Sequence, residues 1–186
     1  MRHNTLFKAL LMLGLSTAAW SLPEDPSVIH GQVQVQNLTP SMMQILQSSP
    51  QAIVNWTRFN IGSGQTVRFL QPDQFASVLN RVTGLDPSVI HGMLQANGRV
   101  FLINPNGILF GPGATVDVGS FMASTLQMSD SDFLAGRYNL TQNATLPMTA
   151  LVNQGTIQVA EGGFVVMVSP LLDHSGAILA QAGQVN

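Results

Sequence analysis

One heptapeptide, DPSVIHG, occurs twice and places a histidine five residues after an aspartate each time. The copies span Asp25–Gly31 and Asp86–Gly92. An imidazole near a carboxylate can serve general acid–base catalysis or bind a metal ion. Neither His30 nor His91 has a second histidine four residues away, and the chain contains no HExxH or CxxC motif. We therefore expect both histidines to be turn residues rather than ligands or bases.

The remaining candidates for chemistry are equally isolated. The SDSD run at 129–132 offers carboxylates to calcium, but it lacks the glycine and the distal glutamate of an EF-hand loop. Helix-start preferences favour a cap for a short helix at DFLAG instead. His174 stands alone in LLDHSG, and the GPG at 111–113 is not followed by GK[ST]. The sequence therefore predicts no catalytic residue, no metal site and no cofactor.

The first 21 residues have the organisation of an export signal. A basic stretch, MRHNTLFK, precedes the apolar run ALLMLGL and the small residues STAAWS, where a peptidase could cut after Ala19 or Ser21. The run is shorter than the roughly 20 apolar residues of a permanent membrane span. We expect a cleaved signal at 1–21 and one domain at 22–186.

Charge is scarce in the expected mature chain. Five arginines, no lysine and nine acidic residues remain after the signal. Such a chain has no electrostatic footprint for nucleic acid. Cysteine is also absent, although exported domains often depend on disulfides. Its stability must come from backbone pairing and apolar burial.

Short alternating stretches predict a mostly β protein. Apolar and polar residues alternate at Val33–Val35, Phe59–Ile61 and Val67–Phe69, which is typical of strands with one buried face. Between such stretches lie four turn-forming tetrapeptides: GSGQ at 62–65, ANGR at 96–99, NPNG at 104–107 and GPGA at 111–114.

A 21-residue repeat appears in the last third of the chain. It relates NQGTIQVAEGGFV to HSGAILAQAGQV and matches Gly155 to Gly176, Ile157 to Ile178 and Gly162 to Gly183. A period near 20 fits one coil of a parallel β-helix, whose coils bury their apolar faces by stacking. An antiparallel sandwich with evenly spaced hairpins is the alternative.

The repeated heptapeptide fits this architecture as a structural unit. In the second copy Asp86 suits a helix N-cap, Pro87 the first helical position and Gly92 the end of the turn. Strand-like residues, QVQVQ and MLQA, follow the two copies. We expect two similar entries from a turn into a strand.

The most distinctive motif is a turn between two apolar strands, in RVFLINPNGILFGPG at 99–113. Pro105 presets φ at the second position of a tight turn, Asn106 tolerates the third and Gly107 closes it. Asn104 can bond its side chain to the turn backbone. We expect this turn to fix how two buried strands meet.

Taken in order, these motifs resemble a known family. NPNGILFG is preceded by LNRVTGLDPSVIHGMLQANGRVFLI and followed by VDVGSFMASTL and DFLAGRYNL. Together with NWTRFNIGSGQTVRF at 55–69, they are similar to the N-terminal secretion domain of two-partner secretion exoproteins, the filamentous haemagglutinin (haemagglutination activity domain) type. The resemblance covers roughly the whole mature chain.

This resemblance implies a right-handed parallel β-helix with an N-terminal cap and extra-helical β elements. It also implies Sec export, recognition in the periplasm by the POTRA domains of a TpsB-type outer-membrane transporter, and delivery to the surface or medium of a Gram-negative bacterium. The NPNG hallmark points to Asn104, Pro105, Asn106, Gly107 and Ile108 as the secretion motif, with Asn55, Trp56, Phe59, Asn80, Arg81 and Val82 as supporting family residues.

Two departures qualify the resemblance. Some members carry a second motif, NPNL, where this chain has QPDQ at 71–74, which places it nearer the adhesin-like branch. Family exoproteins also usually run for many hundreds of residues. We therefore expect the chain to continue in a longer exoprotein, whose missing part would hold any ligand sites for host cells or glycans.

Two other functions are alternatives to secretion targeting. Parallel β-helices also serve as polysaccharide-degrading enzymes, which need carboxylates or bases gathered on one face. The acids of this chain are scattered, so we expect no enzyme. A self-sufficient carbohydrate-binding adhesin needs aromatic platforms, and Trp56 and Tyr138 are the only tryptophan and tyrosine sure to remain in the mature chain.

Overall fold

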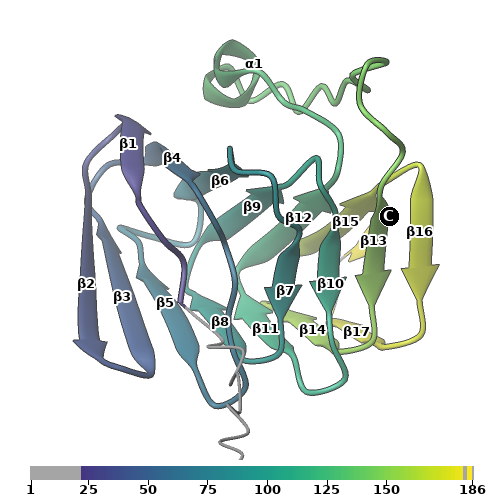
Figure 1. Ribbon diagram of the computed structural model, residues 1–186. Coiled ribbons are helices and arrows are strands. Elements are labelled where there is room, and N and C mark those ends of the chain that lie inside the picture. The colour runs from purple at the N-terminus through teal and green to yellow at the C-terminus, as the bar shows by residue number, and fades with distance from the viewer. Residues whose placement is uncertain (1–21, 182–183, 186) are drawn as a thin grey trace, which may run out of the picture.

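The computed structural model describes residues 22–181 and 184–185, so the expected signal at 1–21 and Gly183 of the repeat lie outside the described residues. The described part forms strands and one short helix (Figure 1). Their bounds are β1 Ser27–His30, β2 Val33–Thr39, β3 Met42–Gln47, β4 Gln51–Trp56, β5 Thr66–Leu70, β6 Ser77–Val82, β7 Ser88–Ile90, β8 Met93–Ala96, β9 Arg99–Ile103, β10 Ile108–Phe110, β11 Thr115–Val118, β12 Ser120–Ser124, α1 Asp130–Leu134, β13 Ala150–Asn153, β14 Thr156–Val159, β15 Phe164–Val168, β16 Leu171–His174, β17 Ala177–Ala180 and β18 Gln184–Val185.

These strands form three sheets that the chain visits in turn. Sheet I has the order β1-β4-β6-β9-β12-β15-β18, sheet II the order β16-β13-β10-β7, and sheet III the order β17-β14-β11-β8-β5-β3-β2. Each coil passes from sheet III to sheet I and then to sheet II, and successive coils stack as parallel ranks of arrows in Figure 1. The fold is a β-solenoid of about six turns, which confirms the expected all-β parallel β-helix and excludes the sandwich.

The predicted repeat is the coil itself. Ile157 on β14 pairs in parallel register with Ile178 on β17, 21 residues later. A β-carbon added to Gly176 would collide with the carbonyl oxygen of Gly155. The two glycines therefore stack at a corner where the coils approach too closely for any side chain.

An apolar column fills the inside of the coils. Trp56 and Phe59 meet edge to face at 5.6 Å near the N-terminal end, and Phe110 and Phe121 do so at 5.7 Å farther along. Sheet III strands bury only one face, as the alternating pattern of β5 shows, so the other face meets water. The column also contains Ile45, Val54, Ile61, Val67, Phe69, Val78, Ile90, Leu94, Val100, Leu102, Ile108, Val116, Ala123, Leu151, Ile157 and Val165.

Sheet I is buried on both faces because an insertion covers its outer side. Residues 125–149, between β12 and β13, contain α1 and lie outside the coils (Figure 1). Phe133 of α1 is fully buried against Phe101 of β9, with ring centroids 5.3 Å apart. This second cluster also includes Ile53, Leu79, Ile103, Met122 and Met128. The insertion lies outside the coils, where the family resemblance implied β elements, but its described structure is the helix α1 and an isolated bridge between Gln127 and Thr141.

The N-terminal end is closed by antiparallel strands. β1 pairs antiparallel with β4, and β2 pairs antiparallel with β3. Leu22, Val33 and Val35 pack against the end of the apolar column. Since a parallel coil would otherwise leave this end open, β1 and β2 form the expected N-terminal cap.

Three local expectations are wrong. His30 is not a turn residue, because it is the last residue of strand β1 and follows Val28 in the pairing with β4. The second heptapeptide forms no helical turn capped by Asp86, because Ser88–Ile90 is strand β7, paired with β10. The alternating residues 58–61 form isolated bridges rather than a strand. In all three places the pairing offered by a neighbouring strand or coil decides the local structure. Both heptapeptide copies do form a strand that leads through a turn into the next strand, as expected.

Candidate functional site

The NPNG motif forms the predicted turn between β9 and β10. The amide of Gly107 donates to the carbonyl oxygen of Asn104 at 3.2 Å, which closes the four-residue turn. Gly107 has a φ of 117°, in the region that favours glycine. The turn carries the chain from sheet I into sheet II, as expected.

The side chain of Asn104 fixes this turn and its neighbour. It is fully buried, and its Oδ1 accepts the backbone amide of Asn106 at 2.9 Å, the expected bond to the turn backbone. Its Nδ2 donates to the carbonyl oxygen of Asp86 at 3.1 Å and to Ser88 Oγ at 3.0 Å. One amide therefore joins the turn to the preceding coil.

The rest of the motif is bound on both sides. Asn106 Nδ2 donates to the carbonyl oxygen of Gly84 at 2.8 Å in the preceding coil. Thr149 Oγ1, from the following coil, donates to the carbonyl oxygen of Pro105 at 2.8 Å. Ile108 is buried and starts β10, which lies between β7 and β13 and pairs with both. The turn is thus a junction of three coils.

The supporting residues fall into two groups. In the first group, Trp56 Nε1 donates to Asn80 Oδ1 at 3.0 Å, and Asn80 Nδ2 donates to the carbonyl oxygen of Phe101 at 3.3 Å. Phe59 packs on Trp56, and Val82 is buried beside them. These residues link successive strands of sheet I from within.

The second group ties sheet I to the insertion. Arg81 Nη2 donates to Asp130 Oδ1 at 2.6 Å and to the carbonyl oxygen of Met128 at 2.8 Å. Arg81 Nη1 also reaches Asn55 Oδ1 at 3.3 Å. Because Asp130 begins α1, this guanidinium holds the helix over the sheet.

Only part of the predicted set comes together at the surface. Arg81, Val82, Pro105 and Asn106 line one groove of about 540 Å³, whereas Asn104 and the Trp56 group lie inside. The groove is completed by residues that the sequence analysis did not assign to the secretion motif: Thr83, Gly84, Leu85, Ile103, Gln127, Met128, Ser129, Asp130 and Leu146. The sequence does not show that they share a surface, because the insertion brings them together through folding.

The heptapeptide histidines do not form a joint site. His30 lies exposed on the N-terminal cap, and His91 follows β7 beside Gly111 of the next coil. Within residues 22–181 and 184–185, no group of three metal-ligating side chains gathers. Asp86 instead bonds Arg58 Nε at 2.7 Å, and this contact, with a smaller contribution from Glu24, raises the pKa of Arg58.

The SDSD run acts as the predicted helix cap. Ser129 is the N-cap of α1, and its Oγ accepts the amide of Asp132 at 3.1 Å. The Ser129 hydroxyl, followed by the guanidinium of Arg137, lowers the pKa of Asp132. His174 Nδ1 forms a hydrogen bond with Asn153 Nδ2 at 3.1 Å. The bond joins paired residues of the neighbouring strands β16 and β13.

The QPDQ segment also has a structural position. Gln71 Nε2 donates to Gln47 Oε1 at 3.0 Å, and Gln71 Oε1 accepts the amide of Gly98 at 3.0 Å, so this buried amide spans neighbouring coils. Asp73 Oδ1 caps the turn by accepting the amides of Phe75 and Ala76, both at 2.8 Å.

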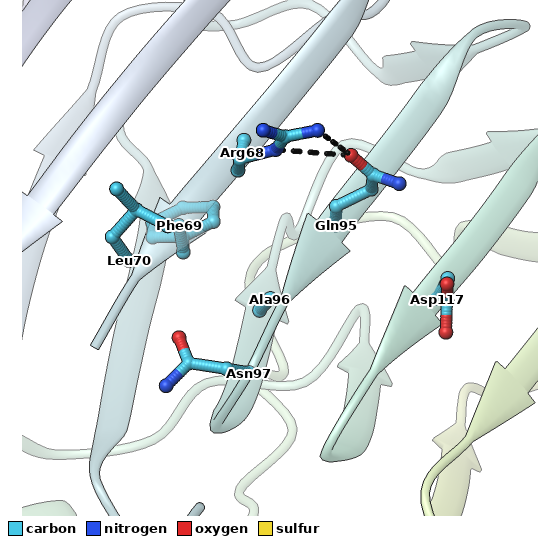
Figure 2. A pocket seen from close by; sticks show the side chains of 7 residues that line it. All are labelled: Arg68, Phe69, Leu70, Gln95, Ala96, Asn97 and Asp117. Carbon is cyan, nitrogen blue, oxygen red and sulfur yellow. Dashed lines mark hydrogen bonds between the residues drawn. The ribbon is translucent and has the colours of Figure 1, made fainter. Parts of the chain in front are cut away.

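A second hollow lies on the solvent face of sheet III (Figure 2). Arg68 points toward Gln95, and its Nε and Nη2 donate to Gln95 Oε1 at 3.2 and 3.0 Å. Asp117, one strand farther, is the single acid in its lining. Glycoside cleavage generally uses two carboxyl groups that flank the scissile bond, and the lining of this hollow provides only the carboxylate of Asp117.

No helix among the described residues has the length and apolar character required to cross a membrane.

Comparison with known proteins places this geometry in a family. The sequence model of the TPS secretion domain, the domain of two-partner secretion exoproteins, matches residues 21–186. The chain belongs to this family. Its members are secreted by Gram-negative bacteria through a partner transporter.

A solved structure and two relatives support the same family assignment. The crystal structure of the HMW1 secretion domain from Haemophilus influenzae superposes with a TM-score of 0.81 at 35% identity, covering 84% of this chain and 41% of that one. Two heme/hemopexin-binding proteins of Haemophilus influenzae are 35% and 40% identical over 64% and 58% of this chain, the second from strain Rd. The chain spans only 13% and 12% of their lengths.

Proposed function

We propose that this domain directs a large exoprotein to its outer-membrane transporter, whose POTRA domains recognise it in the periplasm and pass it to the cell surface. The observation that carries the proposal is the match of a secretion-domain family over nearly the whole expected mature chain, on a β-helix of the same shape.

The physical character of the chain suits such a route. Residues 1–21 would direct Sec export and be cut after Ala19 or Ser21. Without cysteine, the chain needs no reduction of cross-links before it passes a narrow pore. Coils bury apolar surface only by stacking, so folding outside the cell would gain free energy as each coil is added.

Within this function, we assign the NPNG turn a positioning role. Asn104 and Asn106 hold the 84–88 segment by donating to the carbonyl oxygens of Gly84 and Asp86 and to the hydroxyl of Ser88. A turn that is bound in this way sets the shape of the surface around it. The motif would then support recognition through that shape, while its asparagines remain largely inside.

Secretion of turn variants tests this function. The variant Asn106→Val loses the bond to Gly84 and puts a β-branched residue at the third turn position, so we expect export through the partner barrel to fall. The amounts of protein in the culture supernatant and in the periplasm give the readout. Asn37→Val, the same change at an exposed strand position, is the matched control and should be secreted normally. Undiminished secretion of Asn106→Val would contradict the assigned role.

A catalytic function has weaker support. The matched relatives are named as secretion domains and heme/hemopexin-binding proteins rather than as enzymes. Turnover of acidic or neutral polysaccharides by residues 22–186 would establish the enzyme instead.

A further inference from the structure

We propose that the groove beside the NPNG turn is the surface on which the partner transporter's periplasmic domains dock, and that it receives an apolar side chain flanked by a basic one. The inference rests on the proposed function and names the contact surface for it. We call this surface the turn groove, and define it by loop 83–85, Ile103, Pro105, Asn106 and the insertion residues 127–130 with Leu146.

The turn groove combines a large volume with apolar walls. Its cavity measures about 540 Å³, and its floor contains the buried side chains of Val82, Ile103 and Met128. The hollow on sheet III is smaller, at about 330 Å³, and is lined mainly by polar side chains such as Arg68 and Gln95. A groove of this kind suits the insertion of an apolar side chain.

Leu85 stands at the edge of the turn groove with 91% of its surface exposed. Its exposure is held in place, because the carbonyl oxygens on either side of it, from Gly84 and Asp86, accept the amides of Asn106 and Asn104. A β-carbon on Gly84 would also collide with the carbonyl oxygen of Thr57. A rigid loop that presents a large aliphatic side chain loses little entropy on binding.

Charge at the rim points to a partner with basic side chains. The carboxylates of Asp86 and Asp130 have 56% and 43% of their side-chain surface exposed. Arg81, which pairs with Asp130, is only 21% exposed and also bonds the Met128 carbonyl. Asp86 in turn pairs with Arg58, which is 48% exposed and also lies 3.5 Å from Glu24. These ion pairs hold three carboxylates against two guanidinium groups, and a lysine or arginine beside the inserted apolar residue would complement the excess negative charge.

The asparagines of the motif are not themselves the contact. Asn104 is fully buried, and the four hydrogen bonds of its side chain are all internal. The side-chain amide of Asn106, a half-buried residue of the groove wall, donates to the carbonyl oxygen of Gly84 and to Asn104 Oδ1. Both side-chain amides act as positioning groups, whereas Leu85 and the apolar walls of the groove meet the partner.

Two variants test the turn groove without disturbing the fold. Leu85→Asp removes the exposed aliphatic group and places a hydrated carboxylate where the partner's apolar side chain would pack, at a residue with almost no internal contact. Gln127→Trp fills the groove from an exposed position whose side chain makes no described hydrogen bond. Leu179→Asp, at an exposed leucine on the outer face of β17, is the matched control.

The readout is the affinity of the folded protein for the purified periplasmic domains of its cognate transporter, measured by titration calorimetry. We expect the Kd to rise by about tenfold or more for Leu85→Asp and for Gln127→Trp, as for a lost interface hot spot. Leu179→Asp should bind like the wild type. Denaturant midpoints of all variants should equal that of the wild type.

The outcomes separate the two proposals. If both groove variants bind the periplasmic domains as tightly as the wild type does, the turn groove is not the docking surface. The proposed secretion function would still stand. A fall in affinity for Leu179→Asp equal to that for Leu85→Asp would also overturn it, since any added charge would then suffice. A wild-type protein that does not bind the periplasmic domains would overturn both proposals.

Discussion

Buried side-chain amides connect one coil to the next. Asn80, Asn104, Asn153 and Gln71 each lie inside the solenoid and bond to a neighbouring coil. In the described part of the chain, no buried side-chain nitrogen or oxygen lacks a partner. Because an unsatisfied buried group is costly, these amides restrict the coils to one register.

The sharpest residue-scale prediction concerns Asn104. Replacing it with alanine removes four hydrogen bonds and leaves backbone groups of the turn and of the preceding coil without these partners. We expect Asn104→Ala to lower the free energy of unfolding by about 2 to 3 kcal/mol, measured by denaturant titration. Asn37→Ala, on the exposed face of β2, should change it by less than about 0.5 kcal/mol. Equal stabilities for the two variants would show that the amide does not hold the turn.

At the same scale, the sequence predicts the turn and its Asn104 bond because both are local. Pro105 and Gly107 dictate backbone angles wherever they stand. The partners of Asn104 in the preceding coil were not predictable, since they depend on which coils stack. The exposed Leu85 was missed for the same reason, because no periodicity separates an exposed loop leucine from a buried one.

At the scale of elements, a strand's environment outweighs its sequence. The same seven residues give β1, exposed and antiparallel to β4, and β7, largely buried and parallel to β10. Asp25 adopts a φ of 52° in the first copy, whereas Asp86 shows no positive φ in the second. The repeated heptapeptide therefore predicted correctly that the chain enters a strand after each copy. It could not determine the partner strand or the backbone angles of either copy.

The insertion is the element most open to test. Phe133 of α1 fills the outer cluster against Phe101 and Tyr138, with centroid distances of 5.3 and 6.5 Å. We expect Phe133→Ala to destabilise the protein by about 3 to 5 kcal/mol, because it leaves a cavity over sheet I. Thermal unfolding and binding of a hydrophobic dye would report the loss of stability and the uncovered sheet.

Leu134→Ala is the control for that variant, because Leu134 is only partly buried in the same helix. It should cost clearly less. If Phe133→Ala left both stability and dye binding unchanged, the insertion would not be a stable cover of the sheet.

At the scale of the whole molecule, the period of the sequence predicts the solenoid where coils are uniform. β14 and β17 follow one another after 21 residues, and this spacing was visible in the sequence. The paired residues Thr115 and Thr156 are 41 positions apart, since the insertion lies between them. The earlier coils also differ in length, because Met42, Thr66, Met93 and Thr115 pair in turn at separations of 24, 27 and 22 residues. A search for a fixed repeat therefore misses them, so the number of coils and the third sheet emerge only from the structure.

The stacking of coils also explains how the fold can be stable with few charged residues. Each coil pairs its backbone with two neighbours and adds aliphatic side chains to one column, so stability grows with each stacked coil. Specific recognition is then left to the features that break the repeat, namely the NPNG turn and the insertion.

The most direct test of the central claim is to move the domain onto another protein. Residues 1–186 would be fused ahead of an unrelated, cysteine-free passenger and expressed with and without the cognate outer-membrane barrel. Measuring the passenger at the cell surface and in the medium, against the periplasm, gives the answer. The account predicts passenger outside the cell only when both the domain and the barrel are present; passenger that stays in the periplasm with the barrel present, or that leaves without it, would contradict the claim.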